Sequence, residues 1–176
     1  MEALAAYVIP VSSLRSGRNE LDFKVDWRFF RYFEVSPVQQ GSFDITVFFD
    51  KYTDHWHLYF DVRGQMDTEC DRCLAPISLP VSGNYELFVK FDVEKKDVER
   101  SAEIIYVSRE TRQLDIAQFI YEFIVLSIPV KRSYDCENET NPPCDKEMVA
   151  RLERQGAEMS NEALSEMSEM LKKMLK

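Results

Sequence analysis

Hydrophobic and polar residues alternate along the first half of the chain with the two-residue period of β-strands. In the segment NELDFKVD, Leu21, Phe23 and Val25 fall on one side, as in a strand with one buried face. Residues 42–50, SFDITVFFD, and residues 55–70, HWHLYFDVRGQMDTEC, alternate in the same way and are separated only by KYTD. We therefore expect these two segments to form a long antiparallel hairpin.

The alternation continues beyond Cys70. Residues 77–92, ISLPVSGNYELFVKFD, read as another long strand, and residues 103–107, EIIYV, as a short one. Gly64 lies inside the second strand of the hairpin, where a glycine commonly marks a bulge or a sharp twist. The pattern predicts an antiparallel sheet of about five or more strands.

The clearest helical pattern is LDIAQFIYEFIVLSIP, which predicts a helix from Asp115 to Ser127. Asp115 can cap this helix, Gln118 completes the spacing of a capping box, and Pro129 ends it. Its apolar residues repeat at helical spacing, so the helix should lie across the sheet. These residues are Ile116, Phe119, Ile120, Phe123 and Ile124.

The segment WRFFRYF follows Asp26, which can cap a second helix. Trp27, Phe30 and Phe33 would share one face of that helix. We expect this aromatic face to belong to the core rather than to stack on nucleic-acid bases.

The composition changes from residue 133 onward. A polar loop, a helix candidate over residues 148–155 and an amphipathic segment over 161–176 follow one another. The sequence therefore indicates an α+β domain over residues 1–132 and an acidic loop with a C-terminal helical tail over 133–176. In the α+β domain, long antiparallel hairpins are covered by one main helix.

The charge of the chain limits the kinds of macromolecule that we expect it to bind. The net charge is −9, and residues 134–170 hold ten acidic residues against three basic ones. Bulk neutralisation of nucleic-acid phosphates requires a basic face, so a basic protein partner is favoured. The N-terminus lacks the basic start of a secretory signal, and no apolar run approaches the roughly 20 residues that cross a bilayer. We expect a cytoplasmic protein without membrane contacts.

The four cysteines raise three possibilities. Cys70 and Cys73 form a Cys-x-x-Cys pair, which is half of a tetrahedral zinc site, and Cys136 and Cys144 are the only other thiols. The alternatives are reduced thiols that bind no metal, or a disulfide. A thioredoxin-like redox pair is disfavoured because this pair lies between two strands rather than at the start of a helix. Zinc is the one cofactor that the sequence suggests.

No catalytic residues can be assigned. The chain has no Gly-rich phosphate loop and no nucleophile with a recognisable base, so we expect neither an enzyme nor a small-molecule substrate.

The order of several segments nevertheless resembles a known family. IPVSSLRSGRNELDFKVDWRFF precedes a hairpin, CDRCLAPISLPVSGNYELFVKF and then LDIAQFIYEFIVLSIPVK. This order is similar to the bacterial YceD family, the large ribosomal RNA subunit accumulation proteins, over roughly residues 7–132. The resemblance implies a non-enzymatic accessory protein needed for large-subunit ribosomal RNA to accumulate. It implies no established metal site.

Two hypotheses follow. In the first, the protein supports ribosome assembly by contacting a ribosomal protein or an assembly factor, with ribosomal RNA as a further possible partner. Arg72, Lys131 and Arg132 are the candidate contacts to RNA or partner. In the second, the chain is a zinc-stabilised protein-binding module without a ribosomal role.

Overall fold

A computed structural model describes residues 2–91, 104–134 and 142–155 of the chain. These residues belong to two compact units. The first contains the residues up to Thr68 together with Ser78–Val130, and the second contains Glu69–Ile77 with the described residues from Lys131 onward. The expected amphipathic tail over residues 161–176 lies outside the described residues.

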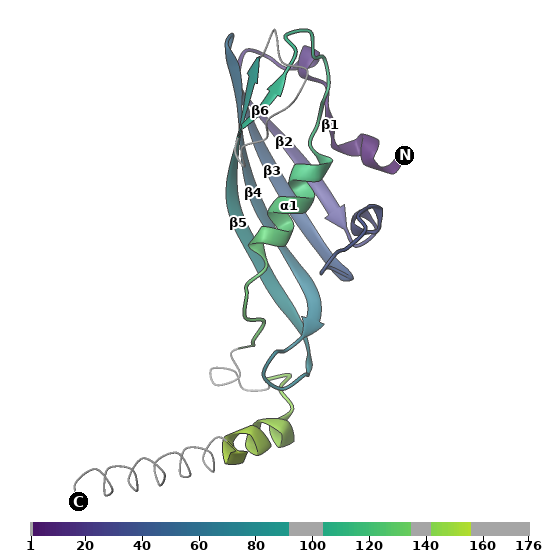
Figure 1. Cartoon of the computed structure of the whole chain (residues 1–176), viewed down its shortest axis with the longest axis vertical. Coiled ribbons are helices and arrows are strands. Elements are labelled where there is room, and N and C mark those ends of the chain that lie inside the picture. Colours follow the sequence, from purple (N-terminus) through teal and green to yellow (C-terminus); the bar gives the residue numbers. More distant parts are fainter. Residues whose placement is uncertain (1, 92–103, 135–141, 156–176) are drawn as a thin grey trace, which may run out of the picture. The chain divides into compact units, whose positions relative to one another are not determined.

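The first unit contains a five-stranded sheet in the order β2-β3-β4-β5-β6 and a small sheet of β1 and β7. One α-helix, α1, lies across the five-stranded sheet (Figure 1). This arrangement confirms the expected α+β class. The elements are η1 (Glu2–Tyr7), β1 (Val8–Ile9), η2 (Val11–Ser13), β2 (Gly17–Asp26), η3 (Phe29–Tyr32), β3 (Gln40–Lys51), β4 (His55–Glu69), β5 (Pro76–Phe91), β6 (Ile104–Val107), β7 (Leu114–Asp115) and α1 (Ala117–Ser127).

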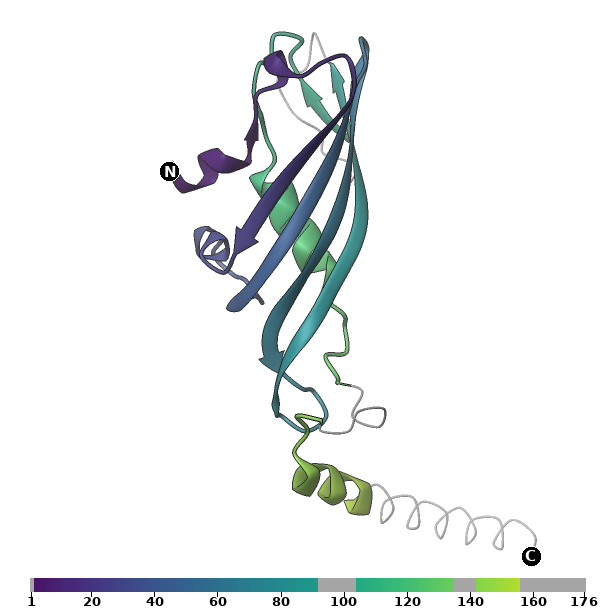
Figure 2. The same cartoon turned by 180° about the vertical axis from the view of Figure 1, so that it is seen from behind.

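The core lies between the sheet and α1. Alternate residues of β3 and β4 point toward the helix and are buried, as the two-residue period requires, whereas Val25 is the one buried residue of β2. Phe123 of α1 packs against Phe60 of β4 at 4.9 Å between ring centroids and stacks on Tyr85 of β5 at 4.6 Å. The opposite face of the sheet carries no described helix (Figure 2).

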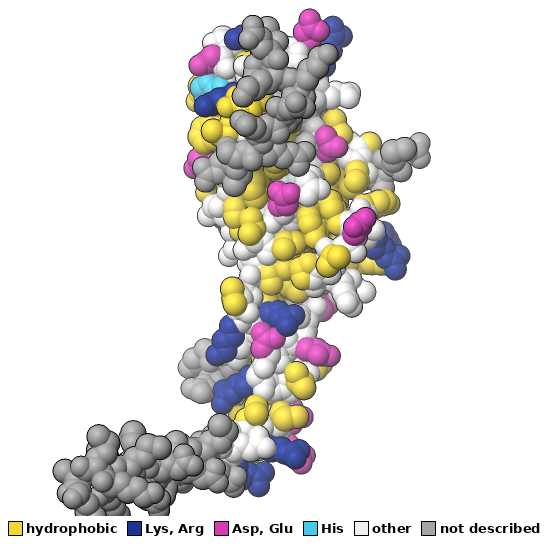
Figure 3. Space-filling view, viewed as in Figure 1, with side chains coloured by type: hydrophobic (Ala, Val, Ile, Leu, Met, Phe, Trp, Pro, Cys, Tyr) yellow, Lys and Arg dark blue, Asp and Glu magenta, His cyan; other side chains and the backbone are white. Residues whose placement is uncertain are grey.

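Some hydrophobic side chains remain exposed. They gather over and around α1 on the face shown in Figure 3. Leu126 at the end of α1 and Val35 are exposed examples. No helix among the described residues is long and apolar enough to span a membrane.

Helix α1 begins two residues later than expected, at Ala117. The Asp115 carboxylate accepts a hydrogen bond from the Ala117 N–H at 2.9 Å, so this aspartate does satisfy a free donor at the helix start. The capping box does not form, because the Gln118 amide donates to Glu122 on the next turn instead.

The expected helix over WRFFRYF is only a short 3₁₀ turn, η3. Asp26 accepts a hydrogen bond from the Arg28 N–H at 2.8 Å, as a capping residue would. The chain becomes extended at Phe33, whose ring stacks on Tyr121 of α1 at 3.9 Å. The turn thus ends after four residues, at the residue that contacts α1.

Two details of the sheet differ from expectation. Strand β6 pairs with β5 in parallel, whereas an antiparallel sheet was expected. Gly64 is not in a bulge, because Ser42, Phe43 and Asp44 pair in continuous register with Gln65, Gly64 and Arg63. A side chain at Gly64 would collide with the Ser42 carbonyl and the Phe43 ring, so close approach explains this glycine.

Candidate functional site

The CDRC segment forms a tight turn in the second unit, between the end of β4 and the start of β5. The Cys70 N–H donates to the Ala75 carbonyl at 2.9 Å, and the Leu74 N–H donates to the Cys70 carbonyl at 2.8 Å. Leu74 adopts a φ of 60°, in the left-handed region that non-glycine residues rarely enter. This conformation reverses the chain directly after Cys73.

The turn buries two free thiols. Cys70 is 1% exposed and Cys73 is 2% exposed. Burial raises the pKa of the Cys70 thiol, but the backbone N–H groups of Tyr134, Arg72 and Cys73 and the Cys73 thiol together outweigh burial and lower this pKa to about 7. These hydrogen bonds therefore favour the thiolate form of Cys70.

A second segment of the chain closes this turn from the side. The Asp71 carboxylate accepts hydrogen bonds from the Arg132 backbone N–H at 2.7 Å and from the Arg132 guanidinium at 2.9 Å. The Asp71 N–H donates in return to the Arg132 carbonyl at 2.7 Å. Two residues later, the Tyr134 N–H reaches Cys70. The segment after α1 therefore provides the hydrogen bonds to the Asp71 carboxylate and one N–H donor to the Cys70 thiol.

Arg72 points to a short helix over residues 146–155. Its guanidinium lies 3.3 Å from the Glu153 carboxylate. Asp145 caps the helix by accepting hydrogen bonds from the N–H groups of Glu147 and Met148 at 2.9 and 3.1 Å. Arg72 thereby links the CDRC turn to this helix.

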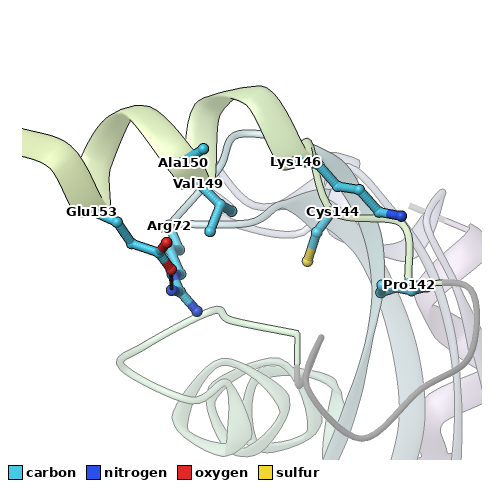
Figure 4. A pocket seen from close by; sticks show the side chains of 7 residues that line it. All are labelled: Arg72, Pro142, Cys144, Lys146, Val149, Ala150 and Glu153. Carbon is cyan, nitrogen blue, oxygen red and sulfur yellow. Dashed lines mark hydrogen bonds and ion pairs between the residues drawn. The ribbon is translucent and has the colours of Figure 1, made fainter.

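A cavity of about 270 Å³ lies beside the Arg72–Glu153 pair (Figure 4). Its wall combines two cations, one carboxylate and apolar groups. It is lined by Arg72, Pro142, Cys144, Lys146, Val149, Ala150 and Glu153.

The structure brings two of the four candidate zinc ligands together, Cys70 and Cys73. Cys144 is disulfide-bonded, and Cys136 lies outside the described residues. Among the residues that the structure describes, no three Cys, His, Asp or Glu side chains gather as a metal site. A disulfide sulfur offers no thiolate, so zinc binding by all four cysteines requires that bond to be reduced. The zinc site stays a prediction.

The three candidate contacts to RNA or a partner differ in their surroundings. Arg72 is paired with Glu153, and Arg132 with Asp71. Lys131 is exposed and forms no ion pair within the described part of the chain. The acidic partners Asp71 and Glu153 were missed in the sequence, because residues far apart along the chain carry no local signal of their contact.

The family model described as large ribosomal RNA subunit accumulation protein YceD matches residues 58–172, which is more than half of the chain. This match starts later than the resemblance seen in the sequence and continues through the acidic C-terminal stretch. Neither the curated proteins nor the solved structures gave a match.

Proposed function

Since the chain belongs to the YceD family, described as large ribosomal RNA subunit accumulation proteins, we propose that it is an accessory factor for large-subunit assembly. In this proposal it acts in the cytoplasm, without catalysing a reaction, by contacting a basic ribosomal protein or an assembly factor. The family match over residues 58–172 is the observation that carries the proposal.

Electrostatics supports protein contacts over bulk RNA binding. The net charge of −9 opposes a general attraction to phosphates. Two of the three candidate cations near the CDRC turn, Arg72 and Arg132, already form ion pairs with carboxylates of the same unit. Any phosphate contact at this place would have to compete with those ion pairs.

The buried thiols support a structural role for the turn. A nucleophilic cysteine must reach its substrate, and reactive cysteines are at least partly exposed. Cys70 and Cys73 are instead enclosed by the backbone of the turn and by the segment after α1. The turn is therefore suited to fixing the local structure rather than to covalent catalysis.

The second hypothesis, a zinc-stabilised binding module without a ribosomal role, keeps one favourable observation. The Cys70 pKa of about 7 makes this thiol ready to lose its proton to a metal. Zinc binding and ribosomal function are compatible, so only a test of the ribosomal role separates the two hypotheses.

Depletion of the protein followed by sucrose-gradient profiling provides that test. We expect free large subunits and large-subunit RNA to fall relative to small subunits, and expression of the wild-type chain to restore them. Normal large-subunit levels after depletion would refute the ribosomal role and leave the binding-module hypothesis.

Direct RNA binding is measured separately with purified protein. Contact between Z cations and single-stranded RNA gives a slope of about −0.7Z in a plot of log affinity against log salt concentration. We expect weak binding with a shallow slope. Tight binding with a steep slope would replace the protein-first mechanism with phosphate recognition.

A further inference from the structure

Four aromatic rings lie side by side on the face of the five-stranded sheet that faces away from α1. Phe48 of β3 is paired directly with Tyr59 of β4, and their rings are 6.2 Å apart. His57 of β4 stacks on Phe88 of β5 at 4.3 Å, with the two planes 2° apart. We call these four residues the aromatic row. All four are half-buried, whereas their strand neighbours Val47, Phe49, Leu58, Leu87 and Val89 are fully buried against the α1 side.

Within the described part of the chain, the aromatic row is accessible to a partner. No described helix covers this face of the sheet (Figure 2). Solvent-facing strand positions are usually polar in a sheet with one covered face. A group of neighbouring rings across three strands that no described helix covers is therefore typical of a contact surface rather than of the core.

Carboxylates border the aromatic row. Glu20 of β2 is the direct cross-strand neighbour of Phe48. Glu86 of β5 lies 3.2 Å from His57. Asp22 comes two residues after Glu20 on the same face and accepts a hydrogen bond from the Thr46 hydroxyl. None of these three carboxylates pairs with a Lys or Arg in the described strands and loops.

Two cations on this face of the sheet already form ion pairs with carboxylates of the same chain. Arg18 forms a two-bond pair with Asp50 at 2.9 and 2.8 Å, and Arg63 pairs with Asp61 at 2.8 Å. The Arg18 guanidinium also lies 5.9 Å from the centre of the Phe48 ring. The aromatic row thus already contacts one guanidinium of its own chain, in the geometry by which ring faces attract cations.

We infer that the aromatic row and its bordering carboxylates bind an Arg- or Lys-bearing segment of a basic partner protein. Ring faces attract the cation, and Glu20, Asp22 and Glu86 accept charge-assisted hydrogen bonds from it. This inference rests on the proposed function and locates the contact with a basic ribosomal protein. The same carboxylates repel phosphates, which disfavours single-stranded RNA even though RNA bases also stack on aromatic rings.

A short synthetic peptide of alternating Arg and Gly is the probe, titrated into the purified full-length chain. Backbone amide NMR shifts should change along the aromatic row and not along α1. Tyr59→Ser should weaken binding by roughly two- to fivefold, because one exposed cation–π contact is lost. Tyr59→Phe keeps the ring and should bind like the wild type. Glu20→Gln should also weaken binding.

Two controls separate a specific surface from general charge attraction. Tyr52→Ser removes an exposed ring in the β3–β4 turn, and Glu34→Gln removes a carboxylate from the loop after η3. Neither change should alter binding, and unchanged melting temperatures confirm that the variants fold. Equal losses in Glu34→Gln and Glu20→Gln, with no effect of Tyr59→Ser, would overturn the inference.

Two further outcomes would also overturn it. These are the absence of peptide binding, and binding of a single-stranded RNA oligonucleotide to this face in place of the peptide. The peptide experiment contains no ribosomes, so its failure leaves the depletion result untouched. Normal ribosome profiles after depletion would in turn refute the proposed function without affecting peptide binding.

Discussion

Asp71 and Arg132 are joined by three hydrogen bonds, and each residue donates to the other. Arg132 donates to the Asp71 carboxylate from its backbone at 2.7 Å and from its guanidinium at 2.9 Å, and the Asp71 N–H donates to the Arg132 carbonyl at 2.7 Å. The backbone N–H of Arg132 first, and then its guanidinium, lower the pKa of the Asp71 carboxyl. The pair fastens the CDRC turn to the segment that follows α1.

Asp71→Asn should loosen this fastening, because the amide has no negative charge and only one acceptor oxygen. We expect faster hydrogen exchange at the backbone amides of Arg132 and Tyr134. The pKa of Asp71 is lower in the folded chain than its ordinary value near 3.8, so its contribution is complete above that value and is lost as the pH falls through the folded pKa. The difference between variant and wild type should therefore shrink on acidification.

Asp67→Asn is the matched control for this prediction. Asp67 is exposed near the end of β4 and forms no ion pair within the described residues. The same chemical change there should leave exchange at Arg132 and Tyr134 unchanged. Equal exchange in wild type and Asp71→Asn would show that the charge of Asp71 does not hold the turn.

The strands and the main helix could be predicted because their signals are local. The two-residue alternation around Phe43 and Phe60 and the helical spacing from Ile116 to Ile124 each reflect one buried face. Burial of that face also sets the strand register, since a slip of one residue would expose every core side chain.

Other features depend on contacts between distant segments. The pairing of Asp71 with Arg132 spans 61 positions, and neither residue differs in sequence from an ordinary surface charge. The parallel direction of β6 depends on the path between β5 and β6, which alternation does not encode. Phe33, the residue that follows η3, stacks on Tyr121, far along the chain. Such tertiary contacts override local helix preference.

Phe123→Ala should strongly destabilise the first unit. Phe123 is buried between Phe60 and Tyr85, and truncation of a core Phe costs about 3–5 kcal/mol in the free energy of unfolding. Leu126→Ala is the control on the same helix, because Leu126 is 67% exposed and should cost less than about 1 kcal/mol. Denaturant unfolding measures both. Similar losses in the two variants would mean that the buried face of α1 has been assigned incorrectly.

The Cys70 thiol should titrate near neutrality, with a pKa of about 7. Since this folded pKa is below the ordinary value of 9.0, ionised Cys70 stabilises the fold most above that value, and the effect is lost as the pH falls through about 7. Tyr134→Pro removes one N–H donor and should raise the pKa, whereas Tyr134→Ala keeps the donor and should not. Ultraviolet absorbance of the thiolate follows the titration. A Cys70 pKa unchanged in Tyr134→Pro would contradict the assigned cause.

A zinc site at the CDRC turn should depend on Cys70, Cys73 and the redox state of Cys144. A zinc ligand must be a thiolate, and the donors around Cys70 favour that form near neutral pH. Cys144 is disulfide-bonded, so the four-cysteine site with Cys136 requires reduction. Protein purified under reducing conditions should then carry about one zinc per chain, and oxidised protein should carry less. Cys73→Ser should abolish the zinc, while Leu74→Gly, which suits the φ of 60° and keeps both thiols, should retain it. Elemental analysis decides the matter. A reduced, folded and metal-free chain would show that hydrogen bonds and ion pairs hold the turn without zinc.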